Sequence, residues 1–148
     1  MISYQKGDIC DVSIGVIAHC ANCFCTMGAG VALSLKRKFP QCFLADIKTV
    51  TGDKTKLGYF SKSVGDPTIY NLYGQYYYGS YRGNSPLDYK ALNQALLLMS
   101  EDLRIQNYQG KVYLPRLGAG LAGGKWNLIE PMIKYHLRNF DTVIVDLK

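Results

Sequence analysis

The residues with the clearest chemical potential lie in one segment, residues 19–32, which has the sequence HCANCFCTMGAGVA. Backbone N–H groups at a glycine-bearing turn, together with the positive end of a following helix dipole, suit an anion. A second glycine-rich segment, PRLGAGLAGG at residues 115–124, has the same potential. Two anion-binding turns on one small domain predict a ligand that carries two phosphates.

His19 and Asn22 are the candidates for catalysis in the first segment. His19 follows an apolar run and lies beside the proposed anion site, where an imidazole can act as an acid or a base. A hydrogen-bonded structural role is the alternative for a histidine at a strand end. The second histidine, His136, lies near the apolar face of an expected helix, so we predict a structural role for it.

The cysteines of this segment leave several roles open. Cys20, Cys23 and Cys25 have the spacing Cys-x-x-Cys-x-Cys, which together with His19 could bind zinc but lacks a second, distant pair of ligands. A thiolate nucleophile near the helix N-terminus is another alternative. We expect small buried thiols and no metal. The odd total of five cysteines is unlike a disulfide framework, so reduced thiols are expected.

Two further features could contact a ligand. Asp8 follows the first expected strand, where it either caps a turn or accepts a hydrogen bond from the exocyclic amine of adenine. The aromatic loop formed by residues 76–78 and Tyr81 either stacks on a base or ribose, or packs on its own domain or a second subunit.

The elements that position these residues follow from the hydrophobic pattern. Strands are expected at residues 2–6, 16–20, 68–73, 111–114 and 142–147, with a further short strand around 57–60. Helices are expected at 29–39, ended by Pro40, at 127–138, and after the capping sequence Ser85-Pro86-Leu87-Asp88. This alternation indicates an α/β fold with helices on both faces of a mixed, largely parallel sheet. Ligands bind such sheets beyond the carboxyl ends of the strands, where both glycine segments lie.

Composition limits the class of protein. The 148 residues suffice for one domain, residues 1–148, and 48% apolar with 19% charged residues is typical of a soluble globular protein. No apolar run approaches the roughly 20 residues that span a bilayer, and the N-terminus is unlike a signal peptide, so we expect a cytoplasmic protein without a membrane partner.

The net charge of +6 favours anionic partners. A small anionic ligand is sufficient to explain it, and nucleic acid is compatible but not required. The basic run at residues 36–38 ends an expected helix, where it complements the helix dipole. The oligomeric state is left open.

Four segments together resemble the macrodomain family: residues 7–9, 19–32, 70–75 and 115–126, in the same order along the chain. The resemblance covers essentially the whole sequence. It implies a single three-layer α/β/α macrodomain that binds ADP-ribose. Within the family, the first glycine segment is similar to those of the animal terminal ADP-ribose protein glycohydrolases and the yeast ADP-ribose 1″-phosphate phosphatases.

The resemblance also implies how ADP-ribose lies in the cleft. Asp8 and Ile9 meet the adenine end, and Asn22 contacts the distal ribose. The two glycine segments enclose the diphosphate from opposite sides. The implied set of binding residues is Asp8, Ile9, Cys20, Asn22, Met27, Gly28, Ala29, Gly30, Val31, Ala32, Arg116, Leu117, Gly118, Ala119, Gly120, Leu121 and Ala122.

Two departures from the family pattern bear on the reaction. Gln75 stands where the resemblance places a lysine in the glycohydrolases, and Ala122 stands where it places an aspartate in the animal enzymes. The leading hypothesis is therefore hydrolysis of ADP-ribose 1″-phosphate, with His19 as general acid or base, Asn22 orienting the distal ribose, and no cofactor. A non-catalytic binder of ADP-ribose or a derived nucleotide, and an ADP-ribosyl hydrolase acting on protein or nucleic acid, are the alternatives.

Overall fold

A six-stranded sheet forms the middle of the molecule. The computed structural model describes residues 1–78 and 86–148. The strand order is β1-β6-β5-β2-β4-β3. The strands are β1 (Ile2–Lys6), β2 (Val16–Ala21), β3 (Phe60–Ser63), β4 (Thr68–Tyr73), β5 (Lys111–Leu114) and β6 (Asp141–Asp146). Only the edge strand β3 runs antiparallel to its neighbour among these strands, so the expected mixed, largely parallel sheet is confirmed.

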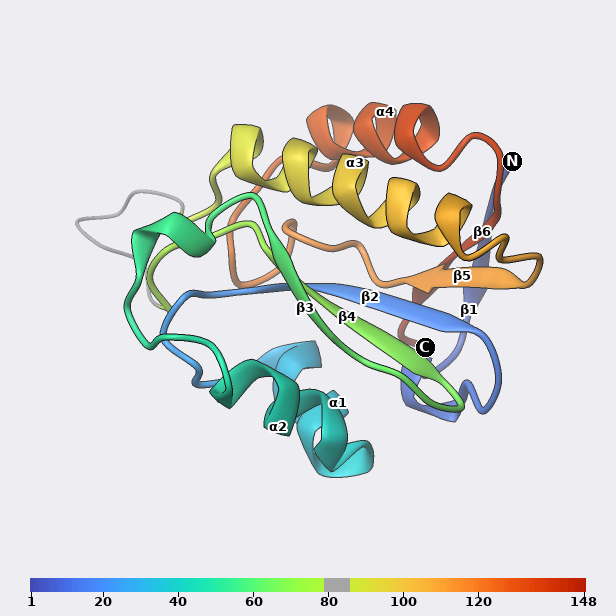
Figure 1. Cartoon of the computed structure of the whole chain (residues 1–148). Coiled ribbons are helices and arrows are strands. Elements are labelled where there is room, and N and C mark those ends of the chain that lie inside the picture. Colours follow the sequence, from blue (N-terminus) through green and yellow to red (C-terminus); the bar gives the residue numbers. More distant parts are fainter. Residues whose placement is uncertain (79–85) are drawn as a thin grey trace.

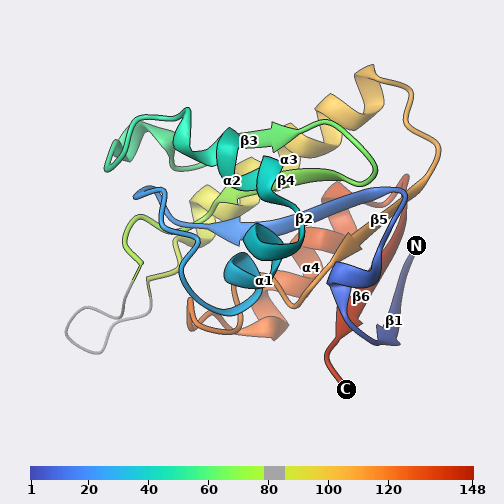
Figure 2. The ribbon, with the colours of Figure 1, turned by 90° about the horizontal axis from the view of Figure 1, so that it is seen from below.

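Helices cover both faces of this sheet, which gives the expected three layers. The pair α1 (Gly30–Lys38) and α2 (Pro40–Ile47) covers one face, and α3 (Tyr89–Ile105) and α4 (Trp126–His136) cover the other (Figures 1 and 2). Two short 3-10 helices, η1 (Ile9–Asp11) and η2 (Lys54–Lys56), lie in connections. None of the helices in residues 1–78 and 86–148 combines the length and apolar character that a bilayer crossing requires.

The central strand β2 explains why an apolar run leads into His19. Val16 and Ala18 pack into the core beneath α3 and α4, whereas Ile17 belongs to the core beneath α1 and α2. Both faces of β2 are therefore buried, as expected for an interior strand of a parallel sheet. The alternation continues to the end of β2, so His19 points toward the α1–α2 layer and Cys20 toward the opposite face.

Helix α2 was not predicted from the sequence. Pro40 follows the end of α1 and is itself the first residue of α2. Proline is favourable there, because the N–H that it lacks would have no hydrogen-bond partner within the helix. The short run after it has one buried side that includes Cys42 and Asp46. This helix carries Asp46 to the ligand cleft described below.

The predicted start of helix α3, at the capping sequence of residues 85–88, was also wrong. Ser85 lies outside the described residues, and Pro86 is not helical. Leu87 instead forms an isolated β-bridge with Gln75, which holds this part of the chain extended. The helix begins at Tyr89, and the Asp88 side chain caps it by accepting from the Ala91 N–H at 3.0 Å.

Candidate functional site

A cleft of about 810 Å³ lies at the carboxyl ends of the parallel strands. The connections that follow β1, β2, β4 and β5 line it, together with residues of α1, α2 and the end of the chain. Because the sheet order separates β1 and β6 from β4, residues 7–9, Val145 and Leu147 line one end of the cleft. Asp46, Gln75 and Tyr78 line the other end.

The two glycine segments face each other across this cleft. Gly30 has φ +59°, and a Cβ at this position would lie 3.0 Å from Leu121 Cδ1 of the second segment. Gly118 has φ +77°. Ala29, the N-cap of α1, provides no side-chain hydrogen bond, so no cap side chain covers the first N–H groups of the helix. The cleft therefore has the geometry of an anion site between two backbone walls.

The cleft brings together nearly all of the residues that the sequence assigned to ligand binding. The exception is Ala119, which packs against the core beneath α3 and α4 instead. The most informative omission from the sequence analysis is Asp46, which lines the cleft from α2. No sequence signal pointed to it, because the helix that carries it was not predicted.

His19 lines the cleft but is only 1% exposed. Its Nε2 lies 2.7 Å from Asn71 Oδ1. The Asn71 amide nitrogen donates to the Cys42 carbonyl and to Ser61 Oγ, so Oδ1 acts as the acceptor and His19 Nε2 carries the proton. His19 Nδ1 then bears a lone pair, and it is the one fully buried side-chain nitrogen or oxygen of the described residues without a hydrogen-bond partner.

Burial also decides the charge of this imidazole. Desolvation lowers the pKa of His19 below its usual value, because the charged form loses its hydration. His19 is thus neutral at neutral pH and can accept a proton at Nδ1. Of the two roles expected for His19, acid or base, the structure therefore favours that of a base or hydrogen-bond acceptor.

Asn22 is bound within its own loop. Its amide nitrogen donates to Thr26 Oγ1 at 2.7 Å, and its Oδ1 accepts from the Phe24 N–H at 2.8 Å. These bonds fix the side chain beside His19 in the cleft wall. One amide hydrogen of Asn22 and the second lone pair of its Oδ1 remain, so this side chain can donate one hydrogen bond to a ligand and accept one from it.

Two of the three cysteines of the first segment, Cys20 and Cys23, are poor candidates for nucleophiles. Burial raises the pKa of Cys20 to about 12 and the pKa of Cys23 to about 11, so both thiols are protonated at neutral pH. No cluster of three or more His, Cys, Asp or Glu side chains suited to a metal ion occurs in residues 1–78 and 86–148. All five cysteines are free thiols.

Asp8 acts as a cap at the opposite end of the cleft. Its Oδ1 accepts from the Cys10 N–H at 2.9 Å at the start of η1. A carboxylate can accept further hydrogen bonds at its second oxygen, and Asp8 lines the cleft. The capping role and the contact with an adenine amine are therefore compatible.

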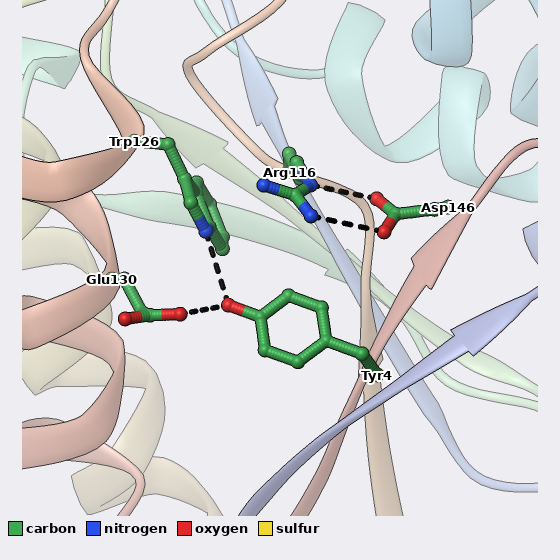
Figure 3. Close-up of polar contacts among 5 residues, drawn as sticks. All are labelled: Tyr4, Arg116, Trp126, Glu130 and Asp146. Atoms are coloured by element: carbon green, nitrogen blue, oxygen red, sulfur yellow. Dashed lines mark hydrogen bonds and ion pairs between the residues drawn. The ribbon is translucent and has the colours of Figure 1, made fainter.

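Arg116, at the start of the second glycine segment, is held by a cluster at the edge of the cleft. Its guanidinium makes two bonds with Asp146, at 2.8 and 3.1 Å (Figure 3). It also lies 5.2 Å from the centre of the Tyr4 ring and 5.3 Å from that of Trp126. Tyr4 completes the cluster by donating to Glu130. The paired and stacked guanidinium is fixed in place, which orders the segment that follows it.

Arg116→Ala should lower the free energy of unfolding by less than about 1 kcal/mol, because the ion pair is largely exposed. Arg116 holds the pKa of Asp146 below its usual value, so the stabilisation is present above the unfolded-state pKa. It should disappear as the pH falls through the depressed pKa. Urea titrations of wild type and variant over this acidic range test this. The contacts of the guanidinium with the Tyr4 and Trp126 rings do not titrate there, so a difference that fails to shrink as the pH falls would contradict the assignment.

The aromatic loop packs largely on its own domain. Phe24 lies edge-on to Tyr76, Tyr77 and Tyr78, with ring centres 4.9, 5.3 and 5.8 Å away. Tyr76 is further anchored by a hydrogen bond to the Gly52 carbonyl. Tyr78 lines the cleft and is 55% exposed, so it is the described member available to a ligand. Tyr81 lies outside the described residues.

His136 has a structural environment. Its Nε2 pairs with Asn93 Oδ1 at 2.7 Å, which joins α4 to α3 on the side of the sheet away from α1 and α2. His136 does not line the cleft. The chain therefore offers a second histidine as a control for His19.

The fold and the cleft define a three-layer α/β/α domain built to hold a phosphate-bearing ligand. No protein-family model matches the chain. An uncharacterised 17.5 kDa protein of enterobacteria phage T4 is 34% identical over 99% of this chain and 96% of its own length. A macrodomain protein from Streptomyces coelicolor has a structure with a TM-score of 0.74 and 28% identity over 99% of both chains.

Two relatives are named for their activity. The ADP-ribose 1″-phosphate phosphatase of Debaryomyces hansenii is 28% identical over 99% of this chain and all of its own length. Human ADP-ribose glycohydrolase OARD1 is 28% identical over 90% of this chain and 82% of its own. The chain has the three-layer fold of a macrodomain, and the two relatives named for an activity are hydrolases of ADP-ribose compounds.

Proposed function

We propose that the protein binds ADP-ribose and hydrolyses ADP-ribose 1″-phosphate to ADP-ribose and phosphate. The observation that carries the proposal is the cleft between two facing glycine segments, which is also lined by His19, a histidine whose buried Nδ1 has no hydrogen-bond partner. Adenine lies at the Asp8 end and the diphosphate lies between the glycine segments. The distal ribose then reaches the end of the cleft formed by β2 and β4.

In this reaction a water attacks the phosphorus of the 1″-phosphate. His19 Nδ1 takes a proton from that water, and the bond between phosphorus and the ribose oxygen breaks. The ribose oxygen acquires a proton from solvent, which leaves ADP-ribose and inorganic phosphate. Backbone N–H groups of the glycine segments stabilise charge on the phosphate oxygens, and Asn22 donates to the distal ribose.

A non-catalytic binder is the second candidate, favoured by two residues in the cleft. Gln75 lines it at the position where the glycohydrolases that the sequence resembles have a lysine, and Ala122 lines it where the animal glycohydrolases have an aspartate. The Gln75 amide donates to the Tyr77 carbonyl at 2.9 Å, so it supports the aromatic loop. Ala122 is buried and offers no reactive group.

Two measurements on the same preparation separate these functions. Calorimetry with ADP-ribose tests binding, and phosphate release from ADP-ribose 1″-phosphate tests turnover. Binding with phosphate release above the uncatalysed rate supports the phosphatase. Binding without release supports the binder, and loss of label from ADP-ribosylated protein or DNA would favour an ADP-ribosyl hydrolase. Absence of ADP-ribose binding would overturn all three.

A further inference from the structure

The proposed reaction leaves one buried acidic group of the cleft unused. Asp46 is 1% exposed and lines the cleft from α2. Its Oδ1 accepts a hydrogen bond from the Tyr73 hydroxyl at 2.7 Å. Within residues 1–78 and 86–148, no donor is assigned to the other carboxyl oxygen. Because His19 Nδ1 is the one fully buried side-chain nitrogen or oxygen of the described residues without a partner, this second oxygen of Asp46 is accessible to solvent, and so it can receive a ligand in the cleft.

Asp46 belongs to the same polar network as His19. From His19 the network runs to Asn71, whose amide donates to Ser61 Oγ at 3.0 Å. Ser61 Oγ lies 2.7 Å from the Tyr73 hydroxyl, which in turn donates to Asp46. Asn71 uses both amide hydrogens as a donor, so the network positions the two groups and does not pass protons between them.

The sheet order places Asp46 far from the adenine end. Asp8 follows β1 at one edge of the sheet, whereas Asp46 contacts Tyr73 at the end of β4, next to the other edge. On the proposed function, with adenine at Asp8, the distal ribose and its 1″ substituent approach Asp46. The inference that follows rests on that orientation.

We propose that Asp46 is a specificity-determining residue for the 1″ position of the ligand. The protonated carboxyl donates a hydrogen bond to an anionic 1″ substituent, whereas the ionised carboxylate repels it. The protein therefore distinguishes ADP-ribose 1″-phosphate from ADP-ribose in a manner that depends on pH, with acidic conditions favouring the phosphorylated ligand.

The surroundings of Asp46 support this behaviour. Burial raises the pKa of Asp46, while the Tyr73 hydrogen bond and the charge of Lys56 on η2 partly offset that increase. The other titratable groups packed nearby are the thiols of Cys23, Cys25 and Cys42. Burial raises the pKa of Cys23 and of Cys42 to about 11, so those two stay neutral. An incoming phosphate raises the pKa of Asp46 further, because like charges disfavour ionisation.

Equilibrium affinities for ADP-ribose and ADP-ribose 1″-phosphate test the proposal. They are measured by competition with labelled ADP-ribose, before measurable phosphate release, from neutral pH down to the lowest pH at which the protein stays folded. Asp46→Asn keeps an oxygen acceptor for Tyr73 and removes the ionisable group. At neutral pH it should bind the phosphorylated ligand on the order of tenfold more tightly than wild type, with ADP-ribose affinity little changed. Exposed Asp141, outside the cleft, supplies the matched control Asp141→Asn.

The pH dependence provides the decisive comparison. The phosphate of the ligand itself titrates near pH 6, so this contribution is common to all variants. Wild type should gain preference for the phosphorylated ligand on acidification more steeply than Asp46→Asn. Tyr73→Phe removes a hydrogen bond that lowers the pKa of Asp46. In this variant the gain in preference for the phosphorylated ligand should therefore begin at a higher pH than in wild type.

Identical pH profiles for wild type and Asp46→Asn would overturn the inference. So would a Tyr73→Phe profile that moves to lower pH. These outcomes are independent of turnover: a protein that binds both ligands but releases no phosphate would contradict the phosphatase, and the affinity comparison would still decide the role of Asp46.

Discussion

His19→Ala should reduce phosphate release from ADP-ribose 1″-phosphate by about 100-fold or more, while the affinity for ADP-ribose changes only a few-fold. The expected loss is that of a general base, which contributes about 10² to 10⁴ in rate. Backbone N–H groups of the glycine segments supply the proposed diphosphate contacts, so they persist in the variant. The measurement is kcat for phosphate release beside calorimetric titration with ADP-ribose.

The acidic limb of the wild-type rate should lie below the ordinary pKa of histidine. A base must be unprotonated to accept a proton, and burial lowers the pKa of His19. His19-dependent activity should therefore be complete at neutral pH and lost only when the pH falls through the depressed value. The dependence should be absent from the residual activity of the variant.

Two further variants separate a chemical role from a structural one. His19→Gln retains an N–H donor for Asn71 and should be more stable than His19→Ala, yet equally slow, because it lacks the imidazole base. His136→Ala removes the other histidine, which pairs with Asn93 away from the cleft, and should retain full activity. Phosphate release by His19→Gln at the wild-type rate would remove His19 from the mechanism.

The sequence predicted the features of the fold that depend on local periodicity. The buried run of β2, the apolar stripe of α3 and the glycine turns after β2 and β5 each appear where the pattern indicated. Element ends shifted where a tertiary contact competed with the local signal. Leu87 pairs with Gln75, so the capping sequence before α3 does not form a helix at Pro86.

The environments of His19 and Asp46 in the cleft were harder to predict, because they depend on hydrogen bonds between segments that are distant in the sequence. The position of the proton on the His19 ring follows from Asn71 on the neighbouring strand. The side chain of Asn71 is in turn oriented by its hydrogen bonds to Cys42 and Ser61. Asp46 reaches the cleft on α2, which was not predicted because Pro40 was interpreted only as the end of the preceding helix. The sequence identifies His19 as a candidate. The register of β2 with β4 places Asn71 beside it, and the hydrogen bonds of the Asn71 amide then assign the His19 proton to Nε2.

Gly124→Ala should destabilise the protein by about 3 kcal/mol and weaken ADP-ribose binding at least tenfold. A Cβ at Gly124 would lie 2.2 Å from Leu87 Cδ2 and 2.5 Å from the Gly118 carbonyl oxygen. That carbonyl also accepts from the Gly124 N–H at 2.7 Å, which closes the second glycine segment. A side chain could move away, but the backbone contact requires the segment itself to shift. Chemical denaturation and calorimetric titration measure the two effects.

Gly120→Ala is the matched control in the same segment. Gly120 lines the cleft, and a Cβ there would meet nothing within 4 Å among the described residues. Its φ is outside the left-handed region, so alanine should be tolerated with stability within about 0.5 kcal/mol of wild type. Equal stability of the two variants would show that the segment can yield at Gly124. If Gly124→Ala lost stability but kept its affinity for ADP-ribose, the hydrogen bond that closes this segment would not be needed for diphosphate binding.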